Sequence, residues 1–179
     1  MTSPDVEVRG VAPDEWRAAR DVRLAMLLDA PRAFGSTYAR SAALTDDDWR
    51  ARHGPDGHPS WLAWEGDRPV GAATLLRPAL AGEDPHLVGM WVSASVRATG
   101  VGRLLVDTVL EQARALGATR VRLDVAIDNE AAVALYRAAG FVETGRTGVL
   151  PWDETVVERE MVRSVGRAGP VRGARRGAR

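Results

Sequence analysis

The residues with the clearest chemical meaning form a glycine loop that follows an apolar run. Residues 86–92 (His-Leu-Val-Gly-Met-Trp-Val) are typical of a strand, and the turn Arg97-x-x-Gly100-x-Gly102 comes directly after them. Glycines allow a tight turn to point its backbone N–H groups outward, and a helix expected from Val101 adds the positive end of its dipole. Such a loop attracts phosphate groups, so we expect it to hold a diphosphate.

A second motif follows this loop with a different spacing. It reads Asn129-x-x-Ala132-x-x-Leu135-Tyr136-x-x-x-Gly140-Phe141, which places an amide, a phenol and a helix-ending glycine in sequence. The glycine loop alone would also suggest a dinucleotide-binding fold. That fingerprint requires a third glycine where this chain has Leu105, and it usually opens the first βαβ unit, whereas three expected strands come earlier here. The two motifs together therefore favour another kind of site.

Both motifs resemble those of the GCN5-related N-acetyltransferases, which transfer an acetyl group from acetyl-coenzyme A (acetyl-CoA) to a primary amine. The resemblance is strong from about Val70 to Phe141 and weaker from Val6 to Val162. It implies a mixed α/β (α+β) fold with about seven strands in a mostly antiparallel central sheet. The sheet is expected to splay between its fourth and fifth strands, with about four helices around it.

The resemblance assigns acetyl-CoA to three segments of the chain. The splayed strand end would bond the pantetheine arm through its backbone, the glycine loop would hold the diphosphate, and the following motif would lie along the pantetheine. The residues concerned are Met90, Trp91, Val92, Arg97, Ala98, Thr99, Gly100, Val101, Gly102, Arg103, Asn129, Ala132, Leu135 and Tyr136. Two ordinary alternatives stay open: an apolar strand end is often core, and Arg103 in a first helical turn can face water.

Tyr136 is the residue we expect to act as general acid. Aminolysis of a thioester expels a thiolate whose reference pKa is about 8.5, and a phenol with a pKa near ~10 is a reasonably matched proton donor. A lone helical Tyr is usually a core aromatic with its hydroxyl at the surface. Its place after Asn129 in the family motif favours the catalytic role.

A general base is also needed, because an alkyl ammonium with a pKa near ~10.4 costs about 4–5 kcal/mol to hold neutral at pH 7. His86 stands at the strand position where histone-modifying members of the family carry a glutamate. An imidazole with a reference pKa near ~6.5 can accept the proton directly or through water. His86 is also compatible with a plain surface position. Three acids are lesser candidates: Glu65, Asp84 and Asp124.

The resemblance places the amine acceptor between the first two helices and the final hairpin. Phe34, Tyr38 and Trp152 are the expected pocket walls, and Asp153 or Glu154 is the expected partner of a cation. Each of these residues can also be an ordinary core aromatic or turn acid. The acceptor and the preferred acyl chain stay open. We expect no metal, because three consecutive acids at 46–48 suit the first turn of a helix better than a metal site.

Composition limits the remaining possibilities. The chain has 179 residues and no Cys, which excludes disulfides and a cysteine nucleophile and favours direct transfer to the amine. All 24 basic residues are Arg, and five of them fall in residues 164–179 without an acid. We therefore expect one N-acetyltransferase domain at 1–163, with a net charge of −5, and a disordered Arg/Gly-rich tail at 164–179.

Location and partners follow from the same sequence. No run approaches the ~18 apolar residues of a membrane span, and the start lacks a basic segment followed by an apolar one, so we expect a cytoplasmic enzyme without membrane contact. The tail arginines lack interleaved aromatics, so no nucleic-acid partner is expected. Members of the family often dimerise, and the sequence leaves the oligomeric state open. A non-catalytic acyl-CoA-binding regulatory module is the main alternative to an enzyme.

These residues must be positioned by elements that the sequence also predicts. Strands are expected at Val6 to Val8, Trp61 to Glu65, Val70 to Arg77, His86 to Val92, Arg120 to Ile127, Phe141 to Leu150 and Thr155 to Val162. Helices are expected from Pro13 to about Asp29, after Thr45, from Val101 to Leu116 and from Glu130 to Ala139. The segment from Phe34 to Thr37 is expected to be a loop.

Overall fold

The computed structural model describes residues 5–80 and 82–166 and is built on one seven-stranded sheet. The strand order is β1-β2-β3-β4-β5-β7-β6. The strands are β1 (Val6–Gly10), β2 (Ser60–Glu65), β3 (Arg68–Leu76), β4 (His86–Val92), β5 (Arg120–Ala126), β6 (Val142–Leu150) and β7 (Asp153–Ser164). The helices are α1 (Trp16–Asp29), α2 (Tyr38–Ala42), α3 (Asp46–Arg52), α4 (Val101–Ala115) and α5 (Glu130–Ala138), with short 3-10 turns at Pro13–Glu15, Pro31–Ala33 and Ala94–Val96.

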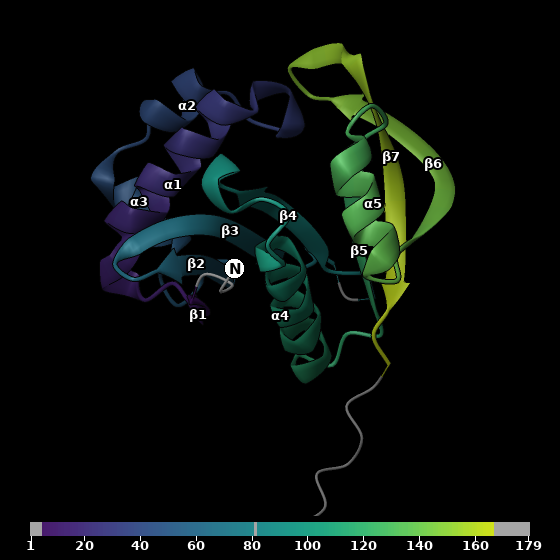
Figure 1. Ribbon diagram of the computed structural model, residues 1–179, viewed down its shortest axis with the longest axis horizontal. Helices are drawn as coiled ribbons and strands as arrows, with labels where there is room; N and C mark the ends of the chain where they lie inside the picture. Colours follow the sequence, from purple (N-terminus) through teal and green to yellow (C-terminus); the bar gives the residue numbers. More distant parts are fainter. Residues whose placement is uncertain (1–4, 81, 167–179) are drawn as a thin grey trace, which may run out of the picture.

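Helices lie on both faces of the sheet (Figure 1). Leu75 and Leu87 point to the face that packs on α4, where Leu105 and Val109 are fully buried. Val133 and Tyr136 bring α5 into the same core. Helices α1 and α3 cover the opposite face, over β2, β3 and β4. Most of the core therefore lies between α4, α5 and the sheet.

The sheet splays between β4 and β5, as the family resemblance implies. All other neighbouring strands are antiparallel, whereas β4 and β5 are parallel and share a single residue pair, His86 with Arg122. Beyond that pair the two strands diverge (Figure 1). Among the described residues, the β5-facing backbone edge of β4 toward Val92 consequently has no neighbouring strand.

A β-bulge lies in β4 at this point. Ala72 pairs with Trp91 and Thr74 pairs with Val88, so Gly89 and Met90 together stand opposite one residue of β3. Gly89 has a φ of 60°, a conformation that glycine adopts without the Cβ penalty. A bulge bends its strand and increases the local twist. This one turns the end of β4 at the place where the sheet opens.

The expected strands and the four expected helices are all present, with ends that differ by a few residues. The expectation of a loop around Thr37 was incomplete, because α2 begins at Tyr38 directly after it. The Thr37 hydroxyl accepts a hydrogen bond from the backbone N–H of Arg40, which caps this additional short helix. The helix after Thr45 begins with a capping box formed with Asp48, in agreement with the expected N-cap.

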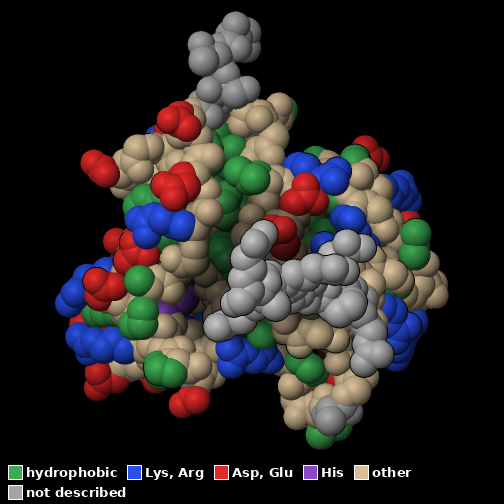
Figure 2. Space-filling view, turned by 90° about the horizontal axis from the view of Figure 1, so that it is seen from below, with side chains coloured by type: hydrophobic (Ala, Val, Ile, Leu, Met, Phe, Trp, Pro, Cys, Tyr) green, Lys and Arg blue, Asp and Glu red, His purple; other side chains and the backbone are tan. Residues whose placement is uncertain are grey.

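The fold continues slightly beyond residue 163. Strand β7 ends at Ser164, and Val165 is buried in the main core, so packing extends past the expected domain boundary. Most of the expected tail, residues 167–179, lies outside the described residues. Within the described residues, no helix combines the length and apolarity needed to cross a membrane. Figure 2 shows side chains of both charges spread over the face seen from below.

Candidate functional site

A pocket of about 660 Å³ lies at the splay and gathers most of the residues that the two motifs predict. The predicted residues that line it are Phe34, Met90, Trp91, Val92, Arg97, Ala98, Gly100, Gly102, Arg103, Asn129, Ala132, Leu135 and Tyr136. Thr99 and Val101 do not line it. Thr99 donates its hydroxyl hydrogen to the carbonyl of Val96 at 2.7 Å, and Val101 is buried in the core. Both residues therefore stabilise the loop without lining the pocket.

The glycine loop contributes Arg97, Ala98, Gly100 and Gly102 to the lining of this pocket. Ala98 and Gly100 have φ values of 62° and 97°, in the left-handed region, which alternates the directions of successive peptide groups. Gly100 is the N-cap of α4 and offers no side chain to accept from its first N–H groups. Those donors and the positive helix end therefore face an open site that suits an anion.

Gly102 brings α4 close to α5 and to β4. A Cβ atom at this position would lie 3.1 Å from the Leu135 side chain and within 3.6 Å of both Met90 and Val92. The absence of a side chain keeps the three pocket segments together. Beside it, Arg103 donates to Asp107 at 2.7 Å and to the carbonyl of Ala138 at 3.0 Å, linking the N-terminal turn of α4 to the end of α5.

Asp29 is a pocket residue that the sequence did not indicate. Its carboxylate accepts a hydrogen bond from the Trp91 indole N–H at 2.9 Å and pairs with the guanidinium of Arg97. The pKa of Asp29 lies below its ordinary value. The hydrogen bond from Trp91 is the largest cause, and the ion pair with Arg97 acts in the same direction. Arg97 also donates to the carbonyl of Val92 at 3.0 Å. These contacts tie the end of α1, the end of β4 and the loop together.

The second motif forms the opposite wall of the pocket. The Asn129 side-chain oxygen caps α5 by accepting from the N–H of Ala132 at 3.2 Å. Tyr136 is 6% exposed and packs edge-on against Phe141, with ring centroids 5.8 Å apart. Burial raises the pKa of the Tyr136 phenol well above its ordinary value, so the phenol stays protonated. Its hydroxyl has no hydrogen-bond partner among residues 5–80 and 82–166, although Tyr136 lines the pocket.

His86 lies outside the lining of this pocket, at the start of β4. Its Nε2 is 3.1 Å from a carboxylate oxygen of Asp124, across the point where β4 and β5 still pair. Glu158 belongs to the same group. Burial, followed by the charge of Asp124, raises the pKa of the Glu158 carboxyl. Among the acids that the sequence offered as alternatives, Asp124 is thus the one joined to His86.

The expected acceptor residues are only partly brought together. Phe34 lines the pocket, and Trp152 donates its indole N–H to the Phe34 carbonyl at 2.8 Å without lining the pocket itself. Tyr38 is 41% exposed and does not line it. Asp153 pairs with Arg32 at 3.3 Å. In the part of the chain that is described, no three His, Cys, Asp or Glu side chains are placed to hold a metal ion.

The sequence from residue 24 to residue 141 matches the family model described as "Acetyltransferase (GNAT) family". The chain belongs to the GNAT acetyltransferase family. A mycothiol acetyltransferase from Geodermatophilus obscurus is 35% identical over 140 residues, which cover 74% of this chain and 44% of that relative. This GNAT protein therefore spans less than half the length of that curated relative.

Solved structures of other GNAT proteins share the fold. An acetyltransferase of the family from Streptococcus pneumoniae has a TM-score of 0.73 at 22% identity, covering 90% of this chain and 100% of that one. The yncA structure from Salmonella typhimurium, which contains acetyl-CoA as its cofactor, has a TM-score of 0.71 at 17% identity and covers 95% and 99% of the two chains. The mixed sheet with its parallel β4–β5 pair is therefore the GNAT fold.

Proposed function

We propose that this GNAT protein is an N-acetyltransferase that moves the acetyl group of acetyl-CoA directly to a primary amine. The observation that carries the proposal is the pocket at the splay, which combines an unpaired strand edge, an uncapped helix N-terminus and a buried phenol. The absence of Cys from the chain favours direct transfer over a thioester-linked enzyme intermediate. Membership of an acetyltransferase family supports the same reaction.

The residues present fit acetyl-CoA. Met90 and Val92 offer backbone groups that can pair with the pantetheine amides as an added strand would. The loop from Arg97 to Gly102 offers N–H donors and the helix dipole to the diphosphate. Ala132 and Leu135 supply an apolar wall on the far side. Arg103, which lines the pocket, would add a positive charge, and its side chain pairs with Asp107.

Tyr136 would protonate the departing thiolate. Its phenol is protonated, lines the pocket and has no competing partner among the described residues. His86, oriented by Asp124 at 3.1 Å, would take the proton of the amine through water, since it does not itself line the pocket. We propose Phe34 and Trp152 as acceptor contacts, and Tyr38 as an outer one.

The experiment pairs calorimetry with a thiol-release assay. Titration of CoA should give saturable heat, and acetyl-CoA should release free thiol in the presence of some members of a broad amine panel. Tight CoA binding without thiol release from any amine would favour the alternative function, a non-catalytic acyl-CoA-binding regulatory module. No binding of CoA at all would contradict both.

If His86 is the base, His86→Ala should move the rise in rate toward higher pH, and an unaltered pH–rate profile would exclude it.

A further inference from the structure

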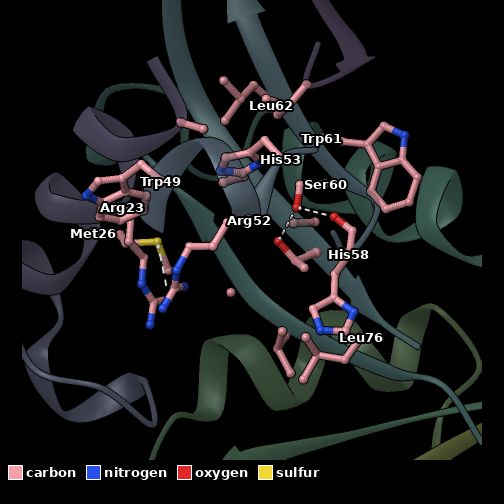
Figure 3. A pocket seen from close by; sticks show the side chains of 17 residues that line it. Arg23, Met26, Trp49, Arg52, His53, His58, Ser60, Trp61, Leu62 and Leu76 are labelled. Carbon is pink, nitrogen blue, oxygen red and sulfur yellow. Dashed lines mark hydrogen bonds between the residues drawn. The ribbon is translucent and has the colours of Figure 1, made fainter. Parts of the chain in front are cut away.

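A second cavity, of about 170 Å³, lies under α1 and α3 on the face of the sheet opposite α4. Arg23 enters it from α1, Arg52 and His53 come from the end of α3, His58 precedes β2 and Ser60 begins it (Figure 3). The Arg23 and Arg52 guanidinium groups lie side by side in this view. No Asp or Glu is among the residues that line the cavity. Its polar surface is therefore basic.

Within the described part of the chain, Arg23 lacks the carboxylate partner that a partly buried cation normally has. No carboxylate lies within 4.0 Å of its guanidinium among residues 5–80 and 82–166, and its only side-chain hydrogen bond in that part of the chain goes to the sulfur of Met26, at 3.9 Å. Burial, followed by the charge of Arg52, lowers the pKa of Arg23 to about 10. A cation that is desolvated without a counter-ion costs stability, so its retention calls for a ligand of opposite charge.

One further donor lies among the polar residues that line this cavity. His53, whose pKa is lowered by burial and by Arg52, remains a neutral imidazole that can donate a hydrogen bond. The Ser60 hydroxyl donates to the carbonyl of His58 at 3.1 Å, so the Thr74 hydroxyl is the donor across the 3.0 Å between the two hydroxyl oxygens, and this pair is satisfied within the protein. The planar guanidinium groups of Arg23 and Arg52 match the geometry of a carboxylate.

This cavity adjoins the pocket at the splay. Arg23 Nη1 lies 3.8 Å from the position of a Cβ built on Gly89, and the next residue, Met90, lines the splay pocket. The Arg23 guanidinium carbon also lies 5.5 Å from the ring centroid of Phe34, another residue of that pocket. A group held by Arg23 is consequently next to the bulge in β4, beside the strand end that is proposed to hold the pantetheine arm.

We propose that this cavity binds the carboxylate of the acetyl acceptor, so that the acceptors are amines that carry a carboxylate near the reacting nitrogen, as amino acids do. The inference rests on the proposed acetyltransferase function. In the reaction, the amine nitrogen forms a bond to the acetyl carbonyl carbon, the carbon–sulfur bond breaks, and one amine proton ends on the sulfur of CoA. Arg23 and Arg52 would hold the carboxylate while the amine faces Met90 and Phe34.

The first test compares acceptors in the thiol-release assay. The probes are the L-amino acids, their α-amides and their decarboxylated amines, with O-phosphoethanolamine as a phosphate-bearing amine. We expect turnover of one or more free amino acids and at least ten-fold lower kcat/KM for the matched amide and amine. Equal turnover of the uncharged partners would overturn the carboxylate site while leaving the acetyltransferase function intact. Preference for O-phosphoethanolamine over the amino acids would also overturn it.

The second test uses Arg23→Met, which keeps an unbranched side chain and removes the charge. KM for the preferred amino acid should rise about 10- to 100-fold with little change in kcat, which is the loss expected for a charged hydrogen bond. The KM of its amide should not change. Arg17→Met is the matched control, because Arg17 is an exposed arginine of α1 that does not line the cavity, and it should behave as the parent protein.

Thermal unfolding separates this proposal from failure of the enzymatic function. Arg23→Met should unfold at a higher temperature than the parent, because it removes a desolvated and unpaired charge; a purely structural arginine would instead lower that temperature. Millimolar concentrations of the amino-acid probes should raise the unfolding temperature of the parent and of Arg17→Met, but not of Arg23→Met. Absence of this difference would overturn the carboxylate site even if no acceptor is acetylated. Absence of CoA binding would count against the proposed function alone.

Discussion

Tyr136 offers the sharpest test at the scale of single residues. Tyr136→Phe removes one hydroxyl and keeps the edge-on contact with Phe141. Because the phenol is expected to protonate the leaving thiolate, kcat should fall about 100-fold, at the lower end of the usual range for acid–base catalysis since a thiolate leaves readily. CoA affinity should change less than three-fold. Steady-state thiol release with calorimetry on the same samples measures both quantities.

The control for this change is the stability of the variant. The hydroxyl has no hydrogen-bond partner among the described residues, so Tyr136→Phe should leave the unfolding temperature almost unchanged or raise it slightly. Loss of activity together with loss of stability would point to a packing role. Unchanged kcat at saturating substrates would remove Tyr136 from the chemistry.

Single residues also show where sequence reasoning reaches its limit. Arg97 could be assigned to the pocket from its motif, because the spacing of a loop and the helix after it is local. Its partner Asp29 could not, since the pair joins positions 68 residues apart and Asp29 has no motif of its own. Arg23 was missed for the same reason. Nothing in the sequence around it shows that its guanidinium is partly buried with no carboxylate within 4.0 Å among the described residues.

At the scale of elements, the positions of β3, β4 and α4 depend on one another through Gly71. A Cβ at Gly71 would lie 3.0 Å from Leu105 of α4 and 3.1 Å from the backbone carbonyl of Trp91 in β4. Backbone atoms cannot move aside as a flexible side-chain end can. The close approach of the two strands therefore fixes where the end of β4 stands relative to the loop.

Gly71→Ala tests this packing. We expect it to lower the free energy of unfolding by about 1–3 kcal/mol, the usual cost of an extra methyl group in a filled core. CoA affinity should fall as well, because the displaced Trp91 carbonyl belongs to the strand end that lines the pocket. Denaturant unfolding and calorimetry measure the two effects. Gly148→Ala in β6 is the control: a Cβ there meets nothing within 4 Å, so neither quantity should fall.

The elements themselves were largely predictable. The β2 and β3 runs flank a Gly-Asp turn at residues 66–67, and α4 has apolar residues at four-residue steps that end near Gly117, so local patterns set both. The bulge at Gly89 was not predictable. It depends on the register between β3 and β4, and an isolated glycine in a strand is only a weak indication of a bulge. Helix α2 was missed because it is one short turn capped by Thr37.

At the scale of the whole molecule, the splay divides the sheet into two halves. Strands β1 to β4 form one half and β5 to β7 form the other, and a single residue pair joins them in the sheet. They share the core beneath, where Leu87 of β4 and Leu123 of β5 belong to the same buried cluster. Where the two halves separate, the pocket is lined on one side by Met90 and Val92 and on the other by Leu135 and Tyr136. A ligand that contacts both sides should couple them.

CoA should therefore stabilise the protein and do so at defined places. At a free concentration 100 times its Kd, binding to the native state adds about 2.7 kcal/mol to the free energy of unfolding, which for a chain of this size raises Tm by about 5–10 °C.

Hydrogen exchange should slow at residues 90–92 and in the loop at 97–103. Pantetheine, which lacks the diphosphate, should slow exchange at residues 90–92 and leave the loop unchanged, because only a phosphate-bearing ligand engages the loop amides. Equal protection of the loop by pantetheine and CoA would contradict its assignment as the diphosphate site. A Tm that stays constant as CoA is raised through its Kd would contradict the coupling of the two halves by one ligand.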